Sequence, residues 1–464
     1  MTVKTIAPTA IALALLLSAC GAATQSMQAR TPTGAHASAT AARAANNAGA
    51  SGAANLPLEY SECMRAHGVR NFPNPVDGHL TLSPSTGINP HSATFQAAAN
   101  ACAAYRPPGG TPADNPPGGP TGATGSKAPA ATHAPWSSLA AWLKTQAAAG
   151  QFSGSVLVAH ADETLLDAGY GLADRSSDTA NTLATRFCIA SIGKLFTAVA
   201  IGQLAQAHKL SFDAPVADYL PELPAAIGQH VTIGELADMT ASLGNVVLSR
   251  PNPPRTLTGM VALIANEPLQ FTPGTRFYYS NDDYILLGAV VQQLSGESYG
   301  DYLREHILDP AGMTHTGYST YIPEHVPEMA HGYALTGPTL HDISAQPQIA
   351  NPSGGAYSTT GDLLKFARAL LDHKLLSPVM TATILQPRVN SPQPGGPPID
   401  EYAYGFAYQQ INGTTFIGHN GGTPGYSGQI DIYPHTGYTV VVLTNQDNTL
   451  VPAIQRTEAI LTGS

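Results

Sequence analysis

The stretch that decides the fold is residues 414–445, TTFIGHNGGTPGYSGQIDIYPHTGYTVVVLTN. It holds three runs of mainly apolar and β-branched residues, at 414–419, 427–433 and 438–445. Segments that contain Gly and Pro separate these runs, at 422–425 and 434–437. Because β-branched residues favour strands while Gly and Pro favour turns, we expect three consecutive antiparallel strands here.

Two further strands are expected much earlier in the chain. Residues 153–159 (SGSVLVA) and 163–169 (ETLLDAG) are separated by a short turn, which is typical of a hairpin. A long, mainly helical region lies between the early and the late strands. We therefore predict an α+β fold, in which an antiparallel sheet built from both ends of the domain is flanked by helices and carries a mostly helical insertion.

The composition limits the possible partners. Hydrophobic residues make up 43% of the 464 residues and charged residues only 11%, which is too apolar for a disordered protein. The formal net charge is -10, and the sequence contains no basic run. A nucleic acid is therefore not expected as a partner, because its phosphates would meet no positive surface.

The N-terminus has the order of a secretory signal. Lys4 precedes the apolar run 6–17, and small residues follow in Leu17-Ser18-Ala19-Cys20. This tetrad resembles the lipobox of bacterial lipoproteins, which implies that residues 1–20 form a signal peptide and that a lipid is attached to Cys20. We expect an extracytoplasmic protein that is lipid-anchored to the cell membrane. The alternative is an ordinary signal, in which case the protein is secreted.

Three segments of different composition follow the signal. Residues 21–56 are mainly Ala, Thr, Ser, Gly and Asn without hydrophobic periodicity, and they predict a flexible tether. Residues 57–106 contain scattered aromatic residues and two cysteines. Residues 107–135 are rich in Pro and Gly and predict a semi-stiff linker. The main domain is expected at 136–464.

The cysteines agree with export. Cys63 and Cys102 bracket one compact segment, so we expect a disulfide between them and a small cysteine-paired module at 57–106. The sequence around them resembles a short cysteine-paired module of bacterial secreted proteins, whose role is unknown. Cys188 lies in an apolar run, which predicts a buried and inert thiol.

The first chemical motif is Ser191-Ile192-Gly193-Lys194. Apolar residues follow it at helical spacing, so we expect Ser191 at the N-terminus of a helix, where backbone N–H groups stabilise negative charge. Lys194 lies one turn further on the same face. A desolvated lysine can lose its proton near neutral pH and act as the base for the serine hydroxyl. The alternative is an N-cap serine followed by a solvated lysine.

The second motif is Tyr279-Ser280-Asn281, which precedes a helical run at 284–294. A tyrosine beside a cationic lysine is expected to have a lowered pKa, so that Tyr279 can pass a proton to the leaving group. Asn281 can bind a substrate amide. The alternative is an aromatic loop that packs on the helix, with Asn281 as its cap.

The third motif is His419-Asn420-Gly421-Gly422 on the first of the late strands. Glycine in a strand lets a substrate approach the backbone closely. The N–H of Gly422 could join that of Ser191 in an oxyanion hole. The alternative is a β-bulge before a turn.

The order Ser-x-x-Lys, Tyr-x-Asn and His-x-Gly resembles the serine β-lactamase and D-alanyl-D-alanine carboxypeptidase family. The surrounding sequence is similar to family blocks in the same order, and the resemblance covers residue 136 to the C-terminus. The blocks are at 187–191, 213–221, 309–313, 354–362 and 418–426.

This resemblance implies an acyl-enzyme mechanism that needs neither a cofactor nor a metal. Ser191 would be the nucleophile, and Lys194 and Tyr279 would share the proton transfer. Asn281, His419 and Gly421 would bind the substrate. The N–H groups of Ser191 and Gly422 would hold the oxyanion.

Two departures from the family pattern bear on the substrate. His419 stands where many lactamases carry lysine, which favours peptidase and esterase members. Residues 236–244 (LADMTASLG) replace a Thr-His-Thr-Ser-Gly-like turn, so the wall of the cleft is expected to differ.

We therefore expect a serine hydrolase with carboxypeptidase-like or esterase activity on a small acyl or D-amino-acid peptide substrate, peptidoglycan being one possible source. The alternatives are a β-lactamase and a non-catalytic receptor for penicillin or cell-wall fragments.

Overall fold

The computed structural model describes residues 133–391 and 401–463, together with residues 61, 64–66, 69, 70, 72, 98 and 102. The predicted signal peptide, the tether and Cys20 lie outside the described residues, as does Cys63. Cys102 is buried and disulfide-bonded, and its predicted pairing with Cys63 stays a prediction. Cys188 is a free, buried thiol, as expected.

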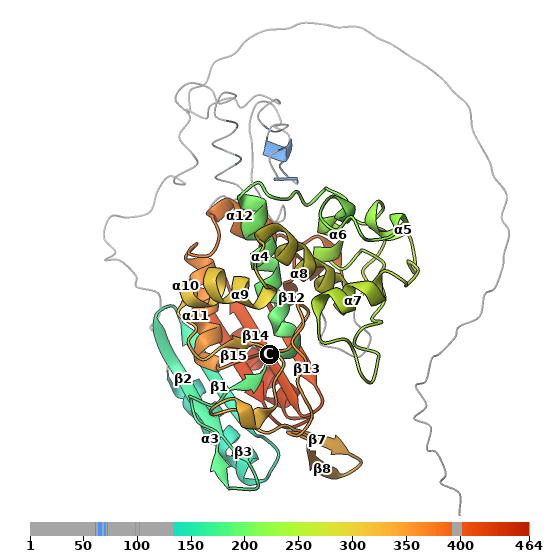
Figure 1. Cartoon of the computed structure of the whole chain (residues 1–464). Helices are drawn as coiled ribbons and strands as arrows, with labels where there is room; N and C mark the ends of the chain where they lie inside the picture. The colour runs from blue at the N-terminus through green and yellow to red at the C-terminus, as the bar shows by residue number, and fades with distance from the viewer. Residues whose placement is uncertain are drawn as a thin grey trace, which may run out of the picture.

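An antiparallel sheet of eight strands forms the centre of the described part of the chain, in the order β10-β11-β12-β13-β14-β15-β1-β2 (Figure 1). Its early strands are β1 (Gly154–His160) and β2 (Glu163–Tyr170). Its late strands are β10 (Val389–Asn390), β11 (Glu401–Tyr402), β12 (Ala407–Ile411), β13 (Thr414–Thr423), β14 (Tyr426–Tyr433) and β15 (Tyr438–Thr444). β1 pairs with β15, so the prediction that both ends of the domain build one sheet is confirmed.

One predicted turn is shorter than expected. Residues 422–425 were expected to form a turn, but β13 continues to Thr423 because Gly422 pairs with Ser427 and Thr423 with Tyr426. Only Pro424 and Gly425 remain for the turn, and Gly425 has a φ of 78°, which glycine adopts without strain. The longer β13 carries the third motif within the sheet.

The two faces of the sheet pack against different layers. Alternate residues of a strand point to opposite faces, and Ile430 and Ile432 of β14 face the helical insertion. Val440 and Val442 of β15 face a second cluster that includes Trp136. Two helices, one from each end of the domain, supply side chains to this second cluster, namely α3 (Ala134–Ala148) and α13 (Leu450–Thr462).

The helical insertion is built around α4 (Lys194–Gln206) and α8 (Asn281–Ser295). Ten of the thirteen residues of α4 are buried, as expected for a helix that is apolar on all sides. The other helices are α5 (Ala225–Gly228), α6 (Ile233–Ala237), α7 (Leu257–Ile264), α9 (Tyr299–Leu303), α10 (Asp309–Ala311), α11 (Thr360–Leu371) and α12 (Pro378–Leu385).

Short strands outside the large sheet complete the fold. They are β3 (Leu172–Asp174), β4 (Thr179–Ala180), β5 (Phe187–Cys188), β6 (Gly317–Tyr318), β7 (Tyr333–Thr336), β8 (Thr339–Asp342) and β9 (Ala356–Ser358). β5 pairs with β9, which places the chain before the first motif beside residues from much later in the sequence. Among the described helices, none combines the length and the apolar character needed to cross a bilayer.

Candidate active site

Ser191 lies in a tight turn between β5 and α4. The prediction that it begins the α-helix needs a small correction, because residues Ala190–Gly193 form a 3₁₀ turn, η3, and α4 begins at Lys194. Ala190 has a φ of 42°, a left-handed conformation that costs energy for a residue with a Cβ. Such local strain persists only where the surrounding packing imposes it.

The packing that holds this turn comes from β13. A Cβ added to Gly421 would lie 2.2 Å from the carbonyl oxygen of Ile189 and 2.9 Å from the backbone nitrogen of Ser191. β13 therefore contacts the turn backbone to backbone, and only glycine fits at position 421. A Cβ added to Gly422 would meet no atom within 4 Å. The sheet thus fixes the turn at Gly421 and leaves open space at Gly422.

Lys194 reaches Ser191 from the first turn of α4. Its amine is fully buried, and Nζ lies 3.0 Å from Oγ of Ser191. Nζ also donates to Oδ1 of Asn281 at 2.7 Å and to the carbonyl oxygen of Ser353 at 2.8 Å. Burial lowers the pKa of Lys194 well below its usual value, and the charge of Asp283 opposes this effect only in part. The expected desolvated lysine is therefore present.

Asn281 is the first residue of α8, and Ser280 caps that helix by accepting a hydrogen bond from the N–H of Asp283. The side chain of Asn281 is held by Asn245, whose Oδ1 accepts from the backbone N–H of Asn281 at 2.7 Å and from its Nδ2 at 3.0 Å. Nδ2 of Asn245 donates to the carbonyl oxygen of Tyr279 at 3.0 Å. Asn245 thus fixes both functional residues of the second motif.

Sequence reasoning missed Asn245 and Ser353. Asn245 directly follows residues 236–244, the segment that departs from the family pattern, and this departure was the one signal that pointed to its neighbourhood. Ser353 acts through its backbone carbonyl, which its side-chain type does not reveal. Oδ1 of Asn351 accepts from the backbone N–H of Ser353 at 3.0 Å and orients this segment.

Tyr279 lies beside Ser191 and Lys194 of the first motif. Nζ of Lys194 lies 4.8 Å from the centre of its ring. The expectation of a lowered pKa is wrong, because burial raises the pKa of Tyr279 and a hydrogen bond with the Ser191 side chain opposes this only in part. The phenol is therefore protonated at neutral pH, and it can act as a proton donor or relay but is not a standing base.

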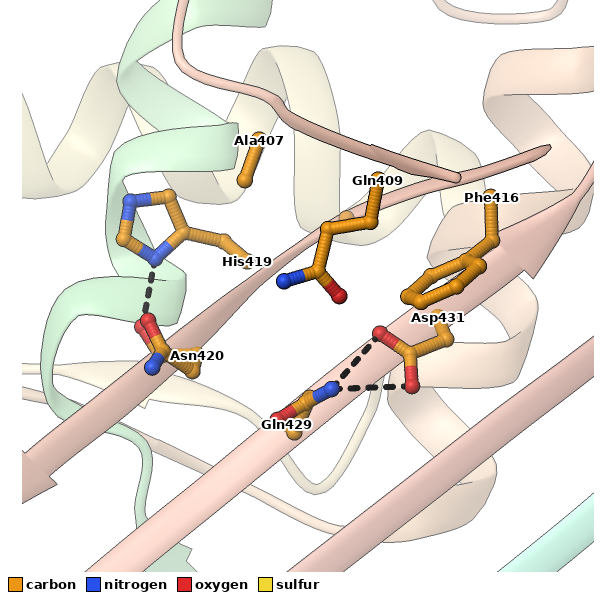
Figure 2. A pocket seen from close by; sticks show the side chains of 8 residues that line it. Ala407, Gln409, Phe416, His419, Asn420, Gln429 and Asp431 are labelled. Atoms are coloured by element: carbon orange, nitrogen blue, oxygen red, sulfur yellow. Dashed lines mark hydrogen bonds between the residues drawn. The ribbon is translucent and has the colours of Figure 1, made fainter. Parts of the chain in front are cut away.

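His419 is buried, with 4% of its surface exposed. Its Nε2 lies 3.2 Å from the hydroxyl of Tyr402, and its Nδ1 is close to the carbonyl oxygen of Asn420. Figure 2 shows the ring turned toward this carbonyl. Burial and then the charge of Lys194 lower the pKa of His419 to about 3, so its ring is neutral. The predicted contact of His419 with substrate stays a prediction, while its ring centre lies 6.1 Å from that of Tyr279.

A pocket of about 270 Å³ brings the three motifs to one surface. Ser191, Asn281 and Gly422 all line it, each from a different motif. The other predicted site residues, Lys194, Tyr279, His419 and Gly421, do not line this pocket. The arrangement presents the Ser191 hydroxyl and exposed strand backbone at Gly422 to a group that enters the pocket, while the Lys194 amine contacts Ser191 from the buried side.

Comparison with known proteins identifies the family. The sequence model of the beta-lactamase family matches residues 139–463. The chain belongs to this family. A putative penicillin-binding protein, PbpX, of Bacillus subtilis is 30% identical over 298 residues, which cover 63% of this chain and 70% of that protein.

Solved structures agree with this assignment to the beta-lactamase family. A penicillin-binding protein from Bacillus halodurans is 32% identical with a TM-score of 0.61, covering 69% of this chain and 99% of that chain. An octameric penicillin-binding protein homologue from Pyrococcus abyssi is 25% identical with a TM-score of 0.63, covering 71% and 78%. The fold is thus that of beta-lactamases and penicillin-binding proteins, a family of serine hydrolases.

Among the described residues, Glu297, Glu305 and His306 have ligand atoms close enough together to hold a metal ion. None of the three lines the pocket with Ser191.

Proposed function

We propose that this protein is a serine hydrolase that forms an acyl-enzyme at Ser191 and acts on a D-alanyl peptide or a small ester. The observation that carries the proposal is the position of the Lys194 amine among three oxygen atoms. Two of these, the amide oxygen of Asn281 and the carbonyl oxygen of Ser353, can only accept hydrogen bonds. A neutral amine has two N–H groups for them and one lone pair left for the hydroxyl of Ser191.

The acylation step follows from this arrangement. Oγ of Ser191 attacks the carbonyl carbon of the substrate, and its proton moves to the lone pair of Lys194. The N–H groups of Ser191 and Gly422 stabilise the oxyanion that forms. The leaving group departs with a proton that returns from Lys194 through the phenol of Tyr279. Water then attacks the ester with the same groups in reverse order, which releases the acid and restores Ser191.

The expected location supports a substrate from the cell envelope. In this proposal Cys20 carries a lipid and residues 21–56 hold the hydrolase domain away from the membrane. Relatives of the chain are named penicillin-binding proteins. Peptidoglycan peptides are therefore the source of D-alanyl substrates that we propose first.

Intact-mass measurement of the full chain tests the acyl-enzyme. With p-nitrophenyl acetate or benzylpenicillin as acylating agent, we expect a Ser191-dependent mass increase, and none in Ser191→Ala. An adduct that decays within seconds would favour a β-lactamase, and one that never decays would favour the receptor alternative. If Ser191→Ala hydrolyses the ester as fast as the native protein does, the proposal is wrong.

A further inference from the structure

A single turn of chain at residues 245–249 brings a leucine to the candidate active-site pocket. The backbone N–H of Ser249 closes the turn by donating to the carbonyl oxygen of Asn245 at 3.1 Å. Val247 is fully buried in the core, whereas Leu248 is 42% exposed and lines the pocket. The turn is therefore anchored in the core at one residue and presents an apolar side chain to the pocket at the next.

Asp282 holds this turn from the first turn of α8. Its Oδ2 accepts a hydrogen bond from the backbone N–H of Val246 at 2.6 Å, and its Oδ1 accepts one from that of Val247 at 3.4 Å. The side chain is buried. Burial raises the pKa of Asp282 to about 6, and both hydrogen bonds oppose this, so the group is a carboxylate at neutral pH. Hydrogen bonds to an ionised acceptor are stronger than those between neutral groups.

The second motif binds the chain just before the turn. Oγ of Ser280 donates to the carbonyl oxygen of Gly244 at 2.8 Å, and the side chain of Asn245 bonds to both neighbours of Ser280. The two bonds of the Asp282 carboxylate come next along the chain and end at the residue directly before Leu248. The position of the leucine therefore depends most directly on Asp282.

Leu248 shares the pocket with other apolar side chains. These come from residues 343–349 and from the turn after β13, and they are Ile343, Pro347, Ile349 and Pro424. Ser191 lines the same pocket, so an acyl group attached to its Oγ enters a space with partly apolar walls. Because removal of apolar surface from water is favourable, such walls stabilise an apolar acyl group.

We propose that Leu248 is a specificity-determining residue for the acyl group and that Asp282 is the positioning residue that holds it in the pocket wall. Of two substrates with the same leaving group, the one with the larger apolar acyl part acylates Ser191 faster. This applies to an ester and to a peptide alike. The inference rests on the proposed function, because it needs an acyl group on Ser191. Asp282 touches no reacting atom in that mechanism and acts through two backbone N–H groups.

Two esters that differ only in the acyl chain test the role of Leu248 in the full chain. For p-nitrophenyl hexanoate and p-nitrophenyl acetate, the ratio of the two kcat/KM values measures the preference for the apolar group. We expect a ratio that favours hexanoate and that falls ~10-fold in Leu248→Ala, because methylene contacts in an apolar pocket discriminate by this order. An unchanged or raised ratio in Leu248→Ala would overturn the inference.

The matched control is Leu371→Ala. Leu371 is 36% exposed, close to the value for Leu248, but it does not line the pocket. We expect its ratio to equal that of the unmodified protein. An equal fall in Leu371→Ala and Leu248→Ala would show that the effect does not come from the pocket wall.

A double-mutant cycle tests whether Asp282 acts through Leu248. In Asp282→Ala we expect the same ~10-fold fall in the ratio, and no further fall when Leu248→Ala is added, because the two residues contribute one effect. Both esters meet the same enzyme, so the ratio does not depend on how much of a variant is folded. Falls that multiply, or an unchanged ratio in Asp282→Ala, would overturn the positioning role.

The conservative variant Asp282→Asn provides a rescue. Its amide oxygen can still accept the N–H of Val246, so it should retain most of the preference for hexanoate. A fall as large as in Asp282→Ala would contradict a turn held by this hydrogen bond.

Failure of the inference and failure of the proposed function are distinguishable. If Ser191→Ala hydrolyses both esters as fast as the unmodified protein does, the proposed function fails and the inference fails with it. If hydrolysis depends on Ser191 but the ratio is the same in the unmodified protein and in every variant, the proposed function stands and the inference alone fails.

Discussion

At the scale of single residues, the environment of Lys194 determines the chemistry. Its amine is buried, and burial lowers its pKa, while Asp283 is the acid that partly restores it. Neutral lysine is a base, whereas protonated lysine is not. A neutral amine donates two hydrogen bonds and accepts one, and the three oxygen atoms around Nζ match this pattern. The geometry of the site therefore agrees with the lowered pKa of Lys194.

Replacing the amine should therefore affect the chemical step. In Lys194→Ala we expect acylation to slow by ~10²–10⁴-fold, the range that a general base contributes. Substrate binding should change little, because the base acts in the transition state. Single-turnover mass spectrometry measures the first quantity and the concentration dependence of the rate measures the second. A raised KM with an unchanged kcat would contradict the role of Lys194.

The pH dependence of acylation follows from the same residue. Because burial sets the pKa of Lys194 well below its ordinary value of 10.5, we expect the neutral amine, and with it acylation, at pH values well below 10.5. Lowering the pH through the depressed pKa protonates the amine, so kcat/KM should fall on the acid side. A profile of kcat/KM from pH 4 to 10 tests this. Activity that appears only near pH 10 would show that the lysine is not depressed.

At the scale of elements, the site depends on how α8 and β13 meet the turn before α4. Asn245 fixes the start of α8 through three hydrogen bonds, to Tyr279 and twice to Asn281. β13 fixes the turn through the close contact at Gly421. Neither contact involves an atom that reacts in the proposed mechanism, but both contacts position residues to which that mechanism gives a role.

Removing the amide of Asn245 tests the first contact. In Asn245→Ala we expect a loss of about 1–3 kcal/mol of stability, because partly buried polar groups of residues 279 and 281 lose their partners. We also expect kcat to fall more than KM rises, since Asn281 no longer holds Lys194. Urea unfolding and steady-state kinetics measure the two effects. Asn266→Ala is the control, because Asn266 is exposed and its side-chain amide donates to the carbonyl oxygen of Ala262, four residues before it.

A pair of glycine substitutions tests the contact of β13. Gly421→Ala forces a Cβ into the backbone of Ile189, so we expect about 1–3 kcal/mol of destabilisation and loss of acylation. Gly422→Ala meets no atom within 4 Å and should keep its thermal midpoint. Equal midpoints for the two variants would show that β13 is not pressed against the turn.

At the scale of the whole molecule, the sheet separates the reactive face from a second polar cluster. Asp431 on β14 is 4% exposed, and Nε2 of Gln429 lies 3.0 Å from both of its carboxylate oxygen atoms (Figure 2). Burial raises the pKa of Asp431 to about 8. Glu458 on α13 adds repulsion, and its own pKa is also raised by burial. An acid pair thus lies where α13 covers the sheet.

This cluster predicts how stability depends on pH. The folded state holds the proton of Asp431 up to about pH 8, whereas the unfolded chain releases it near pH 4. Stability should therefore fall between these values as the pH rises, with a slope of up to about 1.4 kcal/mol per pH unit. Asp431→Asn should flatten this slope in urea unfolding at pH 5 to 9. Asp372 is exposed, so Asp372→Asn should leave the slope unchanged. If Asp431→Asn has the same slope as the unmodified protein, the pH dependence does not come from Asp431.

The sequence by itself determined the elements and the reactive residue types. Strand and helix periodicity depends on residues close in the chain, so the hairpin at 153–169 and the strands after residue 414 could be predicted. The spacing of Ser191 and Lys194 places them one turn apart in any helical backbone, and that pairing also followed from the sequence.

The tertiary structure alone decided the protonation and the surroundings of these residues. The Ser353 carbonyl that holds Lys194 lies 159 positions away in the chain, and Asn245 lies 36 positions before Asn281. No local pattern encodes such contacts. Desolvation has the same origin, because water is excluded by every element packed around a group. The charge of the neighbouring Lys194 led us to expect a lowered pKa for Tyr279, whereas burial raises it. The sequence shows the neighbour but not the burial.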